Sequence, residues 1–182
     1  MSLPFHHFSR RGLAASVTAV LAGLATAGAT WSITTTAEAS QVSQASSGPR
    51  TCTVSDLYLS MGRKEGAAGS LYWPVRFTNT STTGCALRGY PGVSVLDTAH
   101  RQIGPAATRS GSSYSSVTLA PGHSASAVIR TTNGPVGGPC LRTGTYLRFY
   151  PPALHKAVLV PADWKICSGV FQVGPVNTEG TI

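Results

Sequence analysis

Acidic residues are scarce in this chain of 182 residues. Six Asp and Glu stand against fourteen Lys and Arg, which gives a formal net charge of +8 at pH 7. Glycosidases of the common kind need two carboxyl groups on either side of the scissile bond, so this scarcity argues against that chemistry. The basic excess favours polyanionic neighbours such as anionic wall polymers or lipid head groups, although the same charge also keeps a protein soluble.

Motifs for catalysis and for metal binding are also missing from the sequence. It holds no C-x-x-C pair, no G-x-S-x-G elbow and no phosphate-binding glycine loop. The basic residues are scattered, without a run of five or more, so a nucleic-acid patch is not indicated. The sequence therefore predicts no enzyme and no catalytic, cofactor or metal site. The histidines beyond the N-terminal segment all fall in predicted turns or loops, namely His100, His123 and His155.

Residues 1–39 have the composition of a secretory signal peptide. Arg10 and Arg11 form a basic head, and the uncharged run that follows, residues 12–37, is rich in Ala, Val and Leu. The run is also long enough for an uncleaved anchor of roughly 20 residues, but its Ala and Thr content makes it a weak one. We expect export and no stable membrane span after cleavage. The paired arginines leave both the general and the twin-arginine export routes open.

The exit of this segment predicts where the mature protein begins. Ala37-Glu38-Ala39 has the small-x-small form that signal peptidase accepts, which places cleavage before Ser40. Ala25-Thr26-Ala27 is an earlier alternative. The expected organisation of the remainder is a disordered Ser/Gln/Ala-rich leader, one β-sandwich domain and a short C-terminal tail, at residues 40–50, 51–175 and 176–182.

The four cysteines all lie in the expected domain, and they are Cys52, Cys85, Cys140 and Cys167. An even number in an exported chain predicts two disulfides, for which three pairings are possible. Cys52–Cys85 with Cys140–Cys167 is favoured because each bridge joins neighbours along the chain. Each would close a loop of about 30 residues and stabilise the fold by roughly 3 to 4 kcal/mol.

Alternating apolar and polar residues predict β-strands throughout the domain. The pattern is clearest at residues 71–78, 124–132 and 146–150, and Gly- and Pro-rich turns separate these segments. Pro74 places the first of them at a sheet edge or a bulge. No window has the apolar spacing of a helix. The predicted fold is all-β, an immunoglobulin-like β-sandwich stapled by two disulfides.

Several motifs in this order make the chain resemble the domain-of-unknown-function family 4232, found in exported proteins of high-GC Gram-positive bacteria. The resemblance covers most of residues 51–175, and its most specific piece is residues 85–93 with Asn79 upstream. It implies a β-rich domain in the envelope or outside the cell, and no particular chemistry. The motifs are Cys52, Gly66-Ala67-Ala68-Gly69-Ser70, Phe77-Thr78-Asn79-Thr80, Cys85-Ala86-Leu87-Arg88-Gly89-Tyr90-Pro91-Gly92-Val93, Leu119-Ala120-Pro121-Gly122, Cys140 and Cys167.

Aromatic and basic side chains on strand faces are the candidate binding residues. Tyr146, Arg148 and Tyr150 should share the face opposite the apolar residues of their strand, and Tyr72 and Arg76 do the same in theirs. If these faces point outward, they offer stacking and cationic groups. The alternative is that the aromatics pack under loops or a second sheet.

Two functions are consistent with these features. The first is an exported, non-catalytic binding module of the cell envelope or the extracellular space, whose partner is an anionic wall polymer, a glycan or an envelope protein. The second is a secreted protease inhibitor that presents a rigid loop, either residues 109–114 or residues 133–142.

Overall fold

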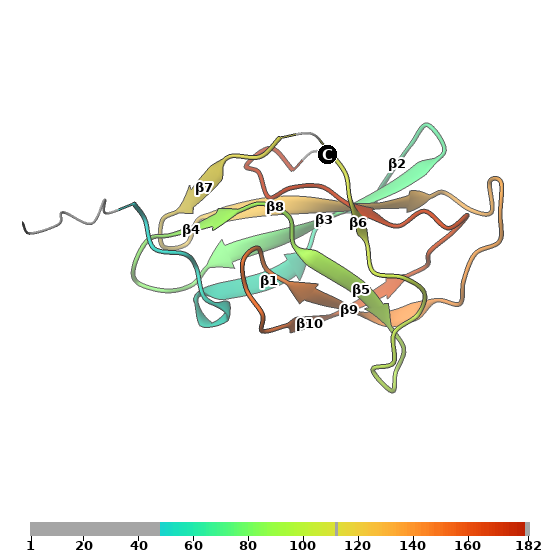
Figure 1. Cartoon of the computed structure of the whole chain (residues 1–182), viewed down its shortest axis with the longest axis horizontal. Coiled ribbons are helices and arrows are strands. Elements are labelled where there is room, and N and C mark those ends of the chain that lie inside the picture. The colour runs from blue at the N-terminus through green and yellow to red at the C-terminus, as the bar shows by residue number, and fades with distance from the viewer. Residues whose placement is uncertain (1–47, 112, 181–182) are drawn as a thin grey trace, which may run out of the picture. The chain divides into compact units, whose positions relative to one another are not determined.

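The computed structural model describes residues 48–111 and 113–180, and it is built from β-strands (Figure 1). A single short 3-10 turn, η1 (Val54–Asp56), precedes the first strand. The predicted signal peptide and residues 40–47 of the leader lie outside the described residues. Within the described part, no helix is long and apolar enough to cross a bilayer.

The larger sheet has the strand order β1-β3-β8-β11-β6, and β2 pairs with the first half of β3. Neighbouring strands are antiparallel except for the parallel pair β11 and β6. Its strands are β1 (Leu57–Met61), β2 (Glu65–Ala67), β3 (Ser70–Asn79), β6 (Thr108–Arg109), β8 (Ser124–Thr132) and β11 (Gln172–Val173).

A second sheet has the order β10-β9-β5, and a separate pair, β4 with β7, lies beside the larger sheet at one end (Figure 1). All these pairings are antiparallel. The strands are β4 (Cys85–Arg88), β5 (Gly92–Leu96), β7 (Ser116–Leu119), β9 (Gly144–Tyr150) and β10 (Val158–Trp164).

The hydrophobic core forms between the two main sheets. Val75 and Phe77 of β3 are fully buried, as are Leu147 and Phe149 of β9. In each strand every second residue points inward, as the period-two pattern predicted. The all-β fold with two disulfides is therefore confirmed, while the immunoglobulin-like connection of its strands stays a prediction.

Pro74 does not lie in an edge strand, so that part of the prediction is wrong. β3 is central, because β8 pairs along one side of it while β1 and β2 pair along the other. The chain leaves the sheet between β1 and β2, where Gly62 donates its backbone N–H to the Pro74 carbonyl at 2.8 Å. Pro74 therefore lies opposite this break, where its missing N–H leaves no ladder hydrogen bond unmade.

The two disulfides join Cys52 to Cys85 and Cys140 to Cys167, the pairing favoured from the order of the cysteines. The first bridge attaches the segment before η1 to the start of β4. The second joins the chain before β9 to the chain after β10. Contacts of the domain extend past its predicted limits, since Arg50 bonds to Asp56 and Val176 is buried.

Candidate functional site

The five predicted binding residues lie in two different sheets. Tyr72 and Arg76 are on β3, and they point away from the core on the outer face of the larger sheet. Tyr146, Arg148 and Tyr150 are on β9, on the outer face of the second sheet. Because the core separates these faces, the five residues form two surfaces.

A row of polar side chains crosses the outer face of the larger sheet at Tyr72. The register pairs Tyr72 with Glu65 of β2 on one side and with Arg130 of β8 on the other. Arg130 in turn pairs with Gln172 of β11, which pairs with Thr108 of β6. Residues paired across a sheet point to the same face, so these five side chains make one row across five strands. We call this row the polar ladder.

Four residues of the polar ladder, all except Thr108, line a groove. Two adjoining hollows of about 450 Å³ each share Glu65, Tyr72, Val128 and Gly180 as lining residues. The last described residues, 178–180, form a wall of the groove, and Asn177 attaches this segment to β8 through paired backbone hydrogen bonds with Ser126. A volume of this size is typical of sites that hold small molecules or segments of polymers.

The groove offers hydrogen-bonding groups of several kinds. The Arg130 guanidinium donates to Ser70 Oγ at 3.0 Å and to Gln172 Oε1 at 2.8 Å, and it lies 5.9 Å from the centre of the Tyr72 ring. Both hydrogen-bond partners of Arg130 are neutral, and none of the ion pairs among the described residues includes it. Ser110 Oγ also lines the groove, and it is buried with no hydrogen-bond partner among the described residues.

The outer face of β9 is organised by contacts of its own. Tyr146 packs edge-to-face on His100, with ring centres 5.0 Å apart. The Arg148 guanidinium lies 5.7 Å from the centre of the Tyr150 ring and donates to Gln102 Oε1 at 2.8 Å. The three predicted residues of this strand therefore form one aromatic and basic surface.

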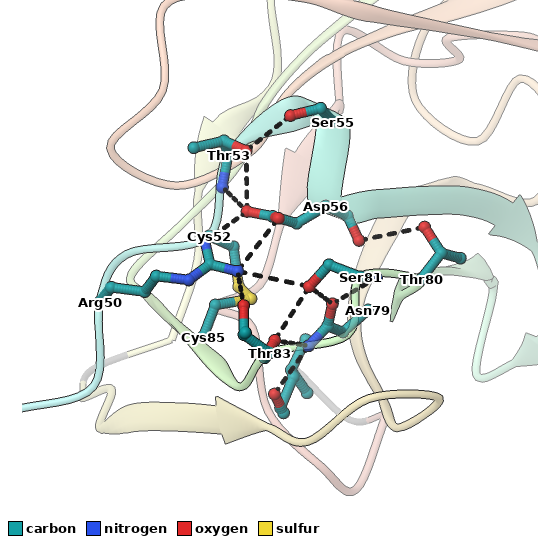
Figure 2. Close-up of polar contacts among 11 residues, drawn as sticks. Arg50, Cys52, Thr53, Ser55, Asp56, Asn79, Thr80, Ser81, Thr83 and Cys85 are labelled. Carbon is teal, nitrogen blue, oxygen red and sulfur yellow. Dashed lines mark hydrogen bonds and ion pairs between the residues drawn. A yellow bond between two sulfur atoms is a disulfide. The ribbon is translucent and has the colours of Figure 1, made fainter.

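One end of the domain is held by a partly buried polar network beside the Cys52–Cys85 disulfide (Figure 2). Arg50 donates to both carboxylate oxygens of Asp56, at 2.7 and 3.1 Å. Thr53 adds its backbone N–H and its hydroxyl. These donors, of which Arg50 is the strongest, hold the pKa of the Asp56 carboxyl well below its usual range.

Asn79 completes this network from the end of β3. Its side chain is fully buried and donates to the carbonyls of Thr83 and Leu119, at 2.9 and 3.0 Å. Its Oδ1 accepts from the backbone N–H and the hydroxyl of Ser81. Asn79 thereby joins β3, the following turn and β7. These hydrogen bonds give a structural reason for the asparagine at position 79, and the disulfide to Cys52 gives one for the cysteine at position 85.

A family model described as Domain of unknown function (DUF4232) matches residues 52–177, from Cys52 to the segment beside the groove. The chain belongs to the DUF4232 family. The match spans both disulfides, Asn79 and the whole of the polar ladder. No curated protein matches the chain.

The histidines of this DUF4232 domain lie outside its strands, as predicted. Asp97 accepts from the backbone N–H groups of Ala99 and Arg101 at 2.9 and 2.8 Å, so it stabilises a turn. In the described ranges, no three His, Cys, Asp or Glu side chains gather as metal ligands would.

Sequence reasoning missed four members of the ladder. Arg130 could have been found, because it follows Ile129 in the alternating pattern of β8 and therefore points outward. Glu65, Thr108 and Gln172 carry no such signal, since β2, β6 and β11 are too short for an alternation to be recognised.

Proposed function

We propose that this DUF4232 domain is a non-catalytic binding module of the cell envelope or the extracellular space, and that it holds a glycan in the groove over its larger sheet. The observation that carries the proposal is the polar ladder in the groove. Tyr72 offers a ring for the C–H face of a sugar, and Arg130, Gln172 and Glu65 offer planar guanidinium, amide and carboxylate groups. Such groups hydrogen-bond to neighbouring hydroxyls in pairs.

The charges at the groove favour a glycan over a simple polyanion. Arg76 and Arg130 are accompanied by Glu65 and Glu179, so the lining residues include groups of both signs. A ligand with many hydroxyls can satisfy both the donors and the acceptors. A ligand with only negative charges would lie against two carboxylates.

An extracellular location is supported by the two disulfides, because such bonds form and persist in oxidising compartments. The predicted signal peptide at residues 1–39 has the same implication. Export would bring the groove into contact with the glycans of the envelope.

The loop at residues 133–142, one of the two considered for the protease-inhibitor alternative, is poorly suited to that role. Val136 at its tip is 63% exposed, but its carbonyl accepts a hydrogen bond from Ser168 Oγ at 2.7 Å. An inhibitor that binds like a substrate must present the carbonyl of its contact residue to the oxyanion hole of the protease. The existing hydrogen bond to Ser168 opposes that use of the loop.

Calorimetric titration with soluble fragments of envelope glycan tests the proposal. Tyr72→Ala should weaken binding by about 1 kcal/mol, roughly fivefold, because one stacking contact is lost. Tyr58→Ala is the matched control, since Tyr58 is a 63% exposed tyrosine on β1 that does not line the groove. Equal affinity in the wild type and Tyr72→Ala would refute the groove as the site. Stoichiometric inhibition of a secreted protease would favour the alternative.

A further inference from the structure

Another group of tyrosines and arginines lies on the surface between the end of β4 and the start of β7. The Tyr90 and Tyr114 rings meet edge-to-face, with centres 5.5 Å apart. The Arg88 guanidinium lies 5.0 Å from the centre of the Tyr114 ring, and the Arg109 guanidinium lies 5.7 Å from that of Tyr90. Two cations therefore flank a pair of aromatic rings, an arrangement that we call the Arg–Tyr cluster.

The backbone around the Arg–Tyr cluster holds it in place. Gly89 has a φ of 104°, a conformation suited to glycine, and it turns the chain between Arg88 and Tyr90. Its carbonyl accepts from the backbone N–H of Val176 at 2.9 Å. The Tyr90 hydroxyl donates to the Gly111 carbonyl at 2.8 Å, which attaches the loop after β6 to the ring.

No carboxylate among the described residues pairs with the arginines of the cluster. The ion pairs within the described ranges all use Asp56 or Asp97, whose partners are other arginines. Arg88 and Arg109 are exposed and have no carboxylate partner among the described residues, and Tyr114 is 44% exposed. An arginine held over an aromatic ring keeps its planar fork of N–H donors for an oxyanion.

We propose that the Arg–Tyr cluster binds oxyanion groups carried along a polymer, as a site separate from the groove. Each guanidinium can donate two hydrogen bonds to a phosphate or a carboxylate. Because the two rings touch and each carries one guanidinium, both cations lie in one patch, and a chain with repeated anions can engage both. A second contact on the same chain gains from high effective concentration. Tyr114, which is partly exposed, offers apolar contact to the linking units.

Calorimetric titration of the folded, oxidised protein with long-chain polyphosphate tests this proposal. The double variant Arg88→Gln/Arg109→Gln should lose affinity by about tenfold or more, because two charged hydrogen-bonding groups are removed. The matched control is Arg63→Gln/Lys165→Gln, which removes the same charge from two other exposed residues and should lose less than about threefold. Equal losses in the two double variants, or no binding by the wild type, would overturn the proposal.

Two further arms separate the alternatives. Inorganic phosphate at the same total phosphate concentration should bind far more weakly than the polymer, and equal affinity would overturn the requirement for a polymer. Tyr72→Ala should bind polyphosphate like the wild type, because Tyr72 belongs to the groove. Loss of polyphosphate binding in that variant would show that the groove, and not the Arg–Tyr cluster, holds the anion.

Discussion

Replacing Asn79 with alanine should be among the most destabilising changes of a polar residue in this domain. The side chain is fully buried, and its amide makes four hydrogen bonds. Each hydrogen bond contributes about 1 kcal/mol net. Loss of Nδ2 also removes a donor from the carbonyls of Thr83 and Leu119, which lie in or near the interior. Ser81 is partly exposed and can bond to water instead. We therefore expect Asn79→Ala to lower the free energy of unfolding by about 2 to 4 kcal/mol.

Denaturation in urea with the disulfides intact measures this loss, and the fluorescence of buried Trp164 can report unfolding. Asn133→Ala is the matched control, because Asn133 is exposed and should change stability by less than about 0.5 kcal/mol. A loss in Asn79→Ala as small as that of the control would refute the view that the network holds this end of the domain.

The variant Asn79→Asp tests the same hydrogen bonds through the pH dependence of its stability. The introduced carboxylate would face the carbonyl oxygens of Thr83 and Leu119 without a donor, whereas its protonated form restores one. Its pKa should therefore be higher in the folded than in the unfolded protein. Stability of this variant should be greatest below about pH 4 and fall as the pH rises, relative to Asn79→Ala. Parallel pH profiles for the two variants would contradict this account.

Three further changes test other parts of the fold. Gly144→Ala should destabilise by about 1 to 3 kcal/mol in the same denaturation assay, because a Cβ there would lie 2.8 Å from the Leu96 carbonyl oxygen. Replacing Cys52 and Cys85 with alanine opens a bridge of sequence separation 33 and should cost about 4 kcal/mol, measured as a lower denaturation midpoint. Hydrogen bonding, chiefly to the Arg101 backbone, lowers the pKa of Asp97 to about 2, so its stabilisation is present above about pH 4 and is lost as the pH falls toward 2. Asp97→Asn should therefore show a smaller loss of stability over that acid range.

Local patterns along the chain predicted most of the fold. The alternation of β3, β8 and β9 predicted both the strands and the residues that form the core, because successive side chains of a strand point to opposite faces. The order of the cysteines favoured the pairing that the structure contains. The motifs around Cys85 and Asn79 indicated the family. The structure accounts for Cys85 through its disulfide with Cys52, and for Asn79 through the hydrogen bonds of its buried side chain.

The sites depended on long-range pairing, which local patterns do not encode. A period of two tells that Tyr72 and Tyr146 point outward, yet not that their strands belong to sheets on opposite sides of the core. The ladder arises because Glu65, Arg130 and Gln172 align with Tyr72 across strands up to about a hundred residues apart in the sequence. Register and sheet order follow from the packing of the whole core, and that packing brings these side chains into one groove.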